Sequence, residues 1–360
     1  MRNLHLIEPT LFDQTGHGFS YNSSIIKANN SWFNMHIWLD KRGSKLFADL
    51  DCISHPYFYR RLRRLQKIVL YYKLLTTDSV VFICTTELTD LIIINWLYKI
   101  LSVKAKVFLH FHQFNIKKKK LNILQKIAKT NPDFYIFTTT AKLTAVFQAQ
   151  GFKKCRTIHC PSFIRNDITV NATKKFEKVI YAGAARKDKG FAAVVDFVGY
   201  IKKIEEDLPF AIQISPPNSG RYDQISQIAI QKLETLPQDN LTLYKTTLEQ
   251  TKYQALFVNA ICLMIYDSDS YYNKFSGVLL DAFYAGCPIV TTPGSYMEDV
   301  INRFKAGIII TDRNPETILN AINTIKNNYI FYSNNVNHAA TILAKEHDPK
   351  NTLLAVLAVT

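Results

Sequence analysis

The residues best suited to chemistry lie within 266–293, where a polar loop leads into an apolar helical stretch and then a short apolar strand. The helix is predicted to begin near Ser276. Ser276 and Gly277 then offer unpaired backbone N–H groups at the positive end of the helix dipole, where a phosphate or carboxylate binds well. Asp281 follows about one and a half turns later, and its carboxylate could accept from the hydroxyls of a ribose attached to that phosphate.

A second candidate segment is the basic loop 181–191, which follows a predicted strand. It contains a glycine turn at Gly183, the cations Arg186 and Lys189, and a helix start at Gly190. Two cations that converge on a diphosphate make charge-assisted hydrogen bonds roughly twice as strong as neutral ones. The loop is therefore a candidate diphosphate site, and a solvated charged turn before a helix is the alternative.

Two further segments follow predicted strands of the N-terminal half. Gly16 and His17 belong to a Gly-His-Gly turn after the first strand, which is either a ligand loop or an ordinary strand-to-helix turn. His110 and His112 end a later strand, and strand alternation sends both to one side of the sheet. A zinc site needs more ligands than these two, so a metal is disfavoured and a buried structural pair is the alternative.

The segment SGVLLDAFYAGCPIV, residues 276–290, resembles the donor-site helix of the GT-B glycosyltransferases of family four. The usual text of that helix is roughly E-G-F-G-L-V-L-L-E-A-x-A-x-G-x-P-V-V. Asp281 corresponds to the second Glu of the family's E-x7-E pair, and Asn273 corresponds to the first. A sub-pattern with a basic residue two positions before Ser-Gly-Val places Lys274 there.

The basic loop resembles the family's V-G-R-L-x-x-x-K-G segment, in which Arg and Lys hold the donor diphosphate. Lys189 with Gly190 matches the Lys-Gly pair. The family's Arg position is Ala184 here, and Arg186 supplies the charge as in variants that read G-x-A-R-x-x-K-G.

The resemblance implies transfer of a sugar from a nucleotide-diphosphate sugar to a hydroxyl acceptor, with retention of configuration and without a metal or other cofactor. Arg186, Lys189 and Lys274, with the helix N-terminus, would stabilise the charge that develops on the β-phosphate as the glycosidic bond breaks. The resemblance also implies that His112 meets the donor sugar and that the Gly-His-Gly loop faces the donor phosphates. The predicted catalytic residues are His112, Arg186 and Lys189, and the predicted donor-binding residues are Gly16, His17, Gly183, Lys274, Ser276, Gly277, Val278 and Asp281.

Three other interpretations remain open. The pattern Asp267-Ser-Asp269 follows a strand and is an alternative metal site, although the basic phosphate-binding loop argues against it. A sugar-nucleotide epimerase on the same fold would need acid and base carboxylates that the sequence does not place. A basic nucleic-acid-binding protein is disfavoured because the aromatic residues follow core periodicity and do not interleave with the basic runs.

Apolar strands alternate with longer helical patterns along the chain, which predicts strand–helix–strand units and parallel sheets. The alternation of strands and helices begins again after residues 151–177, a connector without sustained periodicity. We therefore predict two Rossmann-like doubly wound α/β domains that face each other across a cleft, as in the GT-B fold, with C-terminal helices packing across the domains. The predicted parts are an acceptor-binding domain over 1–155, a nucleotide-sugar-binding domain over 156–335 and a helical segment over 336–360.

The net charge of +15 belongs entirely to the first half of the chain. Residues 1–178 contain 28 Lys and Arg against 11 Asp and Glu, whereas residues 179–360 contain 16 against 18. Such a surface is a solvated basic face or a contact for an anionic membrane, and a lipid-linked glycan is then a candidate acceptor. The basic residues that would contact the membrane are Arg60, Arg61, Arg63, Arg64, Lys117, Lys118, Lys119 and Lys120.

The six cysteines show no C-x-x-C pattern and lie mostly in apolar runs, which is typical of free thiols in a reducing cytoplasm. The longest apolar run, 91–101, is too short to cross a bilayer. We therefore expect a cytoplasmic protein that is soluble or peripheral on the inner face of the membrane, with a role in cell-envelope polysaccharide, lipopolysaccharide or glycolipid synthesis.

Overall fold

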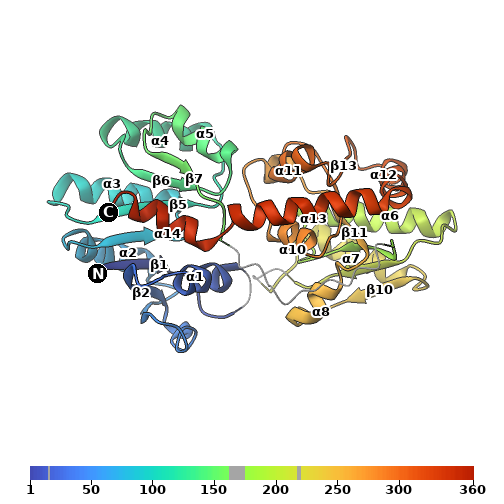
Figure 1. Cartoon of the computed structure of the whole chain (residues 1–360), viewed down its shortest axis with the longest axis horizontal. Coiled ribbons are helices and arrows are strands. Elements are labelled where there is room, and N and C mark those ends of the chain that lie inside the picture. The colour runs from blue at the N-terminus through green and yellow to red at the C-terminus, as the bar shows by residue number, and fades with distance from the viewer. Residues whose placement is uncertain (15–16, 162–174, 217–219) are drawn as a thin grey trace. The chain divides into compact units, whose positions relative to one another are not determined.

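The computed structural model describes residues 1–14, 17–161, 175–216 and 220–360, and the chain divides into two compact units. Unit 1 comprises Met1–Phe163, Asn273–Phe275 and Glu346–Thr360, and unit 2 comprises Ile164–Tyr272 and Ser276–Lys345. Each unit is built on one parallel sheet with helices packed against it (Figure 1). The prediction of two Rossmann-like α/β domains is therefore confirmed.

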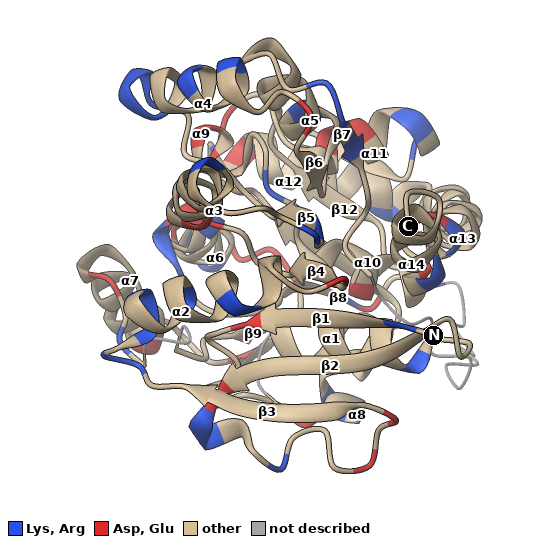
Figure 2. Ribbon diagram, turned by 90° about the vertical axis from the view of Figure 1, so that its left-hand side faces the viewer, with Lys and Arg blue, Asp and Glu red and all other residues tan. Residues whose placement is uncertain are grey.

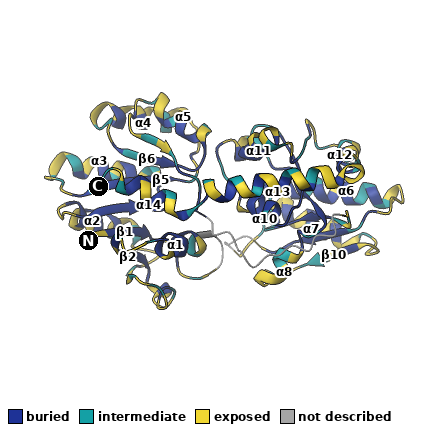
Figure 3. Cartoon of the chain, viewed as in Figure 1, coloured by how far each residue is buried: buried dark blue, intermediate teal, exposed yellow. Residues whose placement is uncertain are grey.

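Unit 1 contains a seven-stranded sheet in the order β3-β2-β1-β4-β5-β6-β7. Every strand pair is parallel, and the central strands are apolar and buried, as expected when helices cover both faces (Figure 3). The strand order reverses between β1 and β4, which makes their carboxyl ends the expected ligand-binding point of this sheet. The strands are β1 (Arg2–Glu8), β2 (Phe33–Asp40), β3 (Ile53–Phe58), β4 (Val80–Ile83), β5 (Lys106–Phe111), β6 (Tyr135–Thr138) and β7 (Cys155–Thr157).

Strands β3 and β7 were not predicted, and both are edge strands. β3 has the sequence ISHPYF and is only partly buried, so it lacks the alternating apolar pattern of an inner strand. Its Pro56 cannot donate a ladder hydrogen bond and is tolerated because the strand lies at the edge. β7 has three residues, which is too short for a recognisable pattern.

The helices of unit 1 cover both faces of the sheet. On one face α2, α3, α4 and α5 contribute to a single apolar cluster, and on the other face α1 and α14 share a second cluster. The helices that connect the strands therefore lie on both faces of the sheet, as in a doubly wound domain. The helices are α1 (His17–Lys27), α2 (Arg63–Leu75), α3 (Leu88–Ile100), α4 (Lys118–Thr130), α5 (Ala141–Ala149) and α14 (Pro349–Leu357), with a short 3₁₀ helix η1 (Lys41–Gly43).

Unit 2 contains a six-stranded parallel sheet in the order β10-β9-β8-β11-β12-β13. The order reverses between β8 and β11, and this pair is the expected ligand-binding point of the second sheet. The strands are β8 (Lys178–Tyr181), β9 (Phe210–Gln213), β10 (Leu241–Tyr244), β11 (Ala260–Met264), β12 (Ile289–Thr291) and β13 (Gly307–Ile309). The helices are η2 (Lys187–Lys189), α6 (Phe191–Lys203), α7 (Gln224–Thr235), α8 (Gln250–Ala255), α9 (Ser268–Tyr271), α10 (Gly277–Tyr284), α11 (Tyr296–Phe304), α12 (Pro315–Asn327) and α13 (Tyr329–Glu346).

The division of the chain differs in two places from the boundaries drawn on the sequence. The stretch that follows β7 groups with unit 1, because Ile158 and Cys160 are buried in the cluster that covers the α1 face. The C-terminal helices also do not form a separate segment. α13 packs in unit 2, whereas Leu353 and Val356 of α14 are part of the same unit 1 cluster.

Candidate functional site

Lys189, Gly183 and Val278 come together at the carboxyl end of the unit 2 sheet, beside the point where its strand order reverses. Gly183 follows β8, has φ of +96° and donates its N–H to Oε1 of Gln213 at 2.7 Å. A Cβ atom built on Gly183 would lie 2.8 Å from Nζ of Lys189 and 3.6 Å from Cγ2 of Val278. A side chain at position 183 would therefore displace the ammonium group, and the positive φ favours glycine there.

Lys189 is a buried cation, with 9% of its surface exposed. No carboxylate of the described part of the chain lies within ion-pair distance of its Nζ, and its recorded neighbour is the ring of Tyr266, 5.5 Å from the ring centre. Burial, followed by the charge of Arg186, lowers the pKa of Lys189 to about 8. The charges of Asp188 and Asp281 favour the ammonium and offset part of the cost of burying it, and a ligand anion in contact with it would offset more.

Arg186 differs from Lys189 because a carboxylate already holds it. Its Nε donates to Oδ1 of Asp188 at 2.8 Å, and a second guanidinium nitrogen donates to Oδ2. Burial favours a lower pKa for Arg186, but the bonds to Asp188 outweigh it and the pKa is raised. Arg186 thus stays charged and is largely neutralised before any ligand binds.

The N-terminus of α10 is built as the sequence predicts, with Ser276 as N-cap residue and Gly277 as first helical residue. No acidic residue occupies the first turn, and no heavy atom of the described residues lies within 4 Å of a Cβ built on Gly277. A side chain at position 277 would therefore meet no described atom, and no carboxylate of the first turn competes for its N–H groups. This combination suits an anion at the positive end of the helix dipole.

Asp281 lies in α10 and its Oδ2 accepts a hydrogen bond from the hydroxyl of Tyr253 at 3.1 Å. Tyr253 belongs to α8 and is half-buried, and burial followed by the charge of Asp281 raises its pKa well above the ordinary value. The tyrosine therefore remains a neutral donor that orients the carboxylate. The sequence did not identify Tyr253, because the contact joins two helices that are far apart in the chain.

Asn273 and Lys274 belong to the three-residue stretch that groups with unit 1. The Asn273 amide is buried and bonds both backbone groups of Phe114, donating to its carbonyl at 2.7 Å and accepting from its N–H at 3.3 Å. The residue at the family's first Glu position thus serves as a structural link. Lys274 is half-buried directly beside it.

At the carboxyl end of the unit 1 sheet, His110 is fully buried and both ring nitrogens have partners. Nδ1 lies 2.6 Å from the hydroxyl of Tyr21, and Nε2 lies 3.2 Å from the carbonyl of Ile158. Burial lowers the pKa of His110 to about 3, so it is a neutral structural residue. His112 follows the end of β5, is half-buried, and its ring centre lies 5.1 Å from that of Tyr21. His112 is therefore the better placed of the two for a ligand.

Glu8 is a buried carboxylate that sequence reasoning missed. It is the last residue of β1, at the point where the strand order of unit 1 reverses. Oε1 accepts from the hydroxyl of Thr10 at 2.7 Å, and Oε2 accepts from the hydroxyl of Thr85, which follows β4. The signal in the sequence was a lone acidic residue closing an apolar strand. Of the Gly-His-Gly loop, Gly16 lies outside the described residues and His17 is the first residue of α1.

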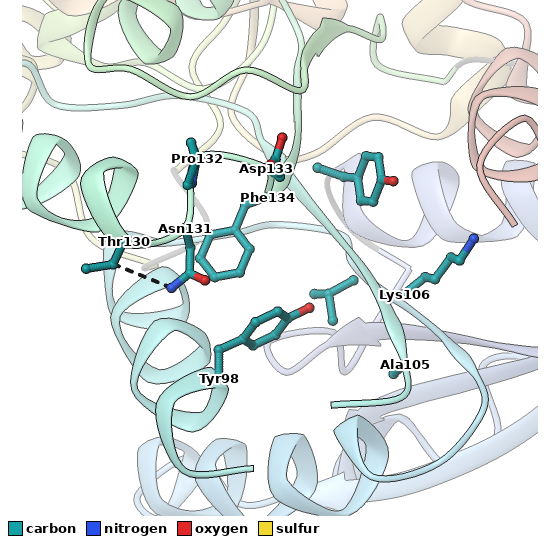
Figure 4. Close-up of a pocket in the computed structure, with 10 residues that line it drawn as sticks. Tyr98, Ala105, Lys106, Thr130, Asn131, Pro132, Asp133 and Phe134 are labelled. Carbon is teal, nitrogen blue, oxygen red and sulfur yellow. Dashed lines mark hydrogen bonds between the residues drawn. The ribbon is translucent and has the colours of Figure 1, made fainter. Parts of the chain in front are cut away.

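A hollow of about 310 Å³ lies at the amino ends of β5 and β6 (Figure 4). This is the edge of the unit 1 sheet opposite to Glu8 and His112, because the strands are parallel. Ligands of open α/β sheets bind at the carboxyl ends, so the hollow is not the predicted site. It is lined by Tyr98, Ala105, Lys106, Val107, Thr130, Asn131, Pro132, Asp133, Phe134 and Tyr135.

Asp267 of the alternative metal pattern accepts from the backbone N–H of Ser270 at 2.8 Å and so caps α9. Among the described residues no group of three His, Cys, Asp or Glu side chains is arranged to hold a metal ion. Asp267 thus has a structural task in this fold.

Comparison with known proteins identifies the class. The model of the family Glycosyl transferases group 1 matches residues 164–341, which are almost all of unit 2. Solved structures match the whole chain at low identity, and a search of curated proteins returns no match. The fold is that of the GT-B glycosyltransferases. The chain carries a glycosyl transferases group 1 domain on that fold and is a glycosyltransferase.

Three of these solved structures illustrate the likeness. Anabaena HepE in complex with UDP-glucose has a TM-score of 0.72 at 11% identity, over 99% of both chains. The lipopolysaccharide outer core galactosyltransferase WaaB has a TM-score of 0.71 at 14% identity, over 99% of this chain and 100% of that one. Sucrose-phosphate synthase from Thermosynechococcus elongatus has a TM-score of 0.70 at 13% identity, over 100% of both. The epimerase and nucleic-acid interpretations gain no support from these matches.

Proposed function

We propose that this glycosyltransferase binds the diphosphate of a nucleotide sugar at Lys189 and the N-terminus of α10, and transfers the sugar to a hydroxyl acceptor with retention and without a metal. The observation that carries the proposal is the buried Lys189 ammonium, which forms no ion pair with a carboxylate of the described residues. The HepE structure contains UDP-glucose, which makes UDP the first nucleotide to test.

The charges of the site suit the reaction. When the bond between the sugar C1 and the β-phosphate oxygen breaks, the acceptor oxygen bonds to C1, the hydroxyl proton is released, and negative charge grows on the leaving diphosphate. Lys189 and the first-turn N–H groups of α10 stabilise this charge in a partly water-excluded place, where such interactions are strong. Arg186 adds a second cation, and Lys274 is a third candidate. Asp281, oriented by Tyr253, anchors the ribose.

The test is release of UDP from a panel of UDP-sugars, with and without EDTA, for the wild type and two variants. Lys189→Ala should reduce turnover at least tenfold, because it removes the buried cation of the site. The matched control is Lys187→Ala, since Lys187 is exposed in the same short helix. Equal loss in both variants, or none in Lys189→Ala, would refute the diphosphate assignment, and loss of wild-type activity in EDTA would refute metal independence.

We also propose a lipid-linked acceptor in cell-envelope glycan synthesis, reached from an anionic membrane surface at the inner face. Helices of a parallel α/β domain begin at the carboxyl ends of the strands, so the basic clusters at the starts of α2 and α4 lie along the edge that holds Glu8 and His112 (Figure 2). These clusters are Arg60, Arg61, Arg63 and Arg64, and Lys117, Lys118, Lys119 and Lys120. None of the described helices is long and apolar enough to cross a membrane.

Both clusters place positive charge at a helix N-terminus, which is the positive end of the helix dipole and repels it. Neither α2 nor α4 has an acidic residue in its first turn to offset this repulsion. An anionic partner at this edge would relieve that repulsion. Replacing the four arginines by Gln should remove most binding to anionic vesicles and leave UDP binding unchanged, as measured by sedimentation and calorimetry. Equal recovery with neutral and anionic vesicles would exclude the membrane surface and favour a water-soluble acceptor.

A further inference from the structure

The outer side of α2 carries an exposed apolar stripe beside its basic residues. Leu62, Leu65, Val69 and Tyr72 are 52–64% exposed, although they are large apolar or aromatic residues. At 100° per residue these four positions fall within an arc of about 80° on the helix. The buried side of α2, with Leu70 and Leu74, faces the sheet. The helix therefore presents a second, unpartnered apolar face.

The neighbouring helix α3 extends this surface. It packs against α2 over the same face of the sheet and exposes Ile92, Trp96 and Ile100, which are spaced at four-residue intervals on its outer side. Seven large apolar side chains are thus exposed on two adjacent helices. Single exposed apolar residues are ordinary, but a grouped set on a folded unit marks a contact surface.

The charge around this surface is mostly positive. Helices α2, α3 and α4 together contain ten Lys and Arg and a single acidic residue, Asp90. Asp90 is buried and bonded to Nζ of Lys67 at 2.8 Å and to the hydroxyl of Tyr71 at 2.7 Å, so it exposes no charge. The same bonds fix α2 against the start of α3. A rigid apolar stripe bordered by Arg61, Arg64 and Lys73 results.

We infer that the outer side of α2 and α3 inserts shallowly into an anionic bilayer, with the stripe Leu62, Leu65, Val69 and Tyr72 among the lipid chains and the arginines at the phosphates. An interfacial helix has this composition, with an apolar face, a basic border and an aromatic residue at the boundary. A protein partner would match the apolar stripe equally well, but the near absence of exposed acidic residues on all three helices favours a polyanionic surface. The inference rests on the membrane surface of the proposed function and adds that apolar side chains enter the bilayer, in addition to the attraction between charges.

The first test is flotation with vesicles of phosphatidylcholine containing 30% phosphatidylglycerol, at low and high salt. Charge attraction weakens with salt whereas apolar insertion does not, so wild-type protein should keep a salt-resistant fraction. The triple variant Leu65→Ser, Val69→Ser, Tyr72→Ser should bind vesicles at least tenfold less than the wild type at high salt. The matched control is Ile225→Ser with Ile228→Ser, which removes two exposed apolar residues from α7 of unit 2 and should change nothing.

The second test uses Trp96 as a depth reporter. Trp38 is buried and Trp32 is partly buried, so Trp96 is the tryptophan most exposed to added lipid. Phosphatidylcholine brominated near the headgroup end of its chains should quench its emission, and Trp96→Phe should abolish most of that quenching.

Any of four results would overturn the inference. Complete release at high salt without quenching would mean attraction by charge alone. Unchanged high-salt binding of the triple variant would mean that another surface inserts. Wild-type self-association that the triple variant loses would mean that the stripe is a contact between copies. Absence of any vesicle binding would remove the membrane surface as well, while calorimetric titration with UDP reports separately on the donor site.

Discussion

The buried charge of Lys189 predicts that replacing this residue stabilises the protein while it abolishes the reaction. Burial lowers the pKa of Lys189 from 10.5 to about 8, so the folded protein binds this proton less strongly than the unfolded chain does. A difference of this size corresponds to about 3 kcal/mol of destabilisation, because one pKa unit is about 1.4 kcal/mol. The penalty is present in full below pH 8 and disappears as the pH rises through 10.5.

Lys189→Met keeps the length and apolar stem of the side chain and removes the charge. Without nucleotide at pH 7 the variant should gain up to about 3 kcal/mol, which for a domain of this size raises Tm by roughly 5–10 °C. The wild type should approach the variant in stability as the pH increases from 8 to 10. Thermal denaturation of both proteins across this range measures the effect, with Lys187→Met as control.

Nucleotide binding supplies the opposite half of the prediction. A diphosphate beside Lys189 raises the pKa of its ammonium, so UDP binding should take up close to one proton near pH 9 and weaken above pH 8. Calorimetry in buffers of different ionisation enthalpy counts that proton, and Lys189→Met should take up none. A less stable Lys189→Met protein, or equal proton uptake in both proteins, would show that Lys189 is neutralised within the fold and would refute the reasoning.

Three further predictions concern other residues. Asp281→Asn should weaken binding of free UDP, and not only of the intact donor, by about 1–3 kcal/mol, since one ribose hydrogen bond to a charged group is lost. If calorimetry shows unchanged UDP affinity, Asp281 is a helix-surface residue without a role in binding. Stability should fall as the pH drops from 6.5 toward 4, because burial lowers the pKa of His5 to about 4 and of His110 to about 3. Over this range the unfolded chain binds more protons than the folded protein does. A denaturation midpoint that stays constant over this range would contradict the prediction. Asn273→Glu restores the family residue but cannot donate to the carbonyl of Phe114, so it should lower Tm without raising activity, whereas a more active variant would show that the position belongs to the donor site.

The parts of the site that the sequence predicts are those whose residues are close together in the chain. Lys189 lies six residues after Gly183, and the strand that ends just before Gly183 and the helix that begins just after Lys189 are local patterns that fix their approach. The start of α10 at Ser276 is also local, since a polar loop changes there to an apolar helical pattern. The two sheets follow from the same kind of signal, because buried parallel strands are continuous apolar runs.

The parts that the sequence does not predict depend on pairs that are far apart. Asn273 and Phe114 are 159 residues apart, and an amide gives no hint of which backbone it will bond. Glu8 and Thr85 meet only because β1 pairs with β4, which is a property of the strand order. The exposed stripe on α2 is hidden for a related reason, since Leu62 and Leu65 resemble core residues until the sheet shows which side of the helix is covered.

The proposed donor site and the proposed membrane surface share one physical feature. Each has positive charge at a place where the fold alone does not favour it. In unit 2 the Lys189 ammonium is buried and forms no ion pair with a carboxylate of the described residues, although the charges of Asp188 and Asp281 favour it. In unit 1 arginines and lysines occupy the first turns of α2 and α4, against the helix dipole. Compensating carboxylates would stabilise both places and would also compete with an anionic ligand. Arg186, held by Asp188, shows what such compensation looks like, and its contrast with Lys189 is the reason we propose Lys189 as the cation that binds the donor phosphate.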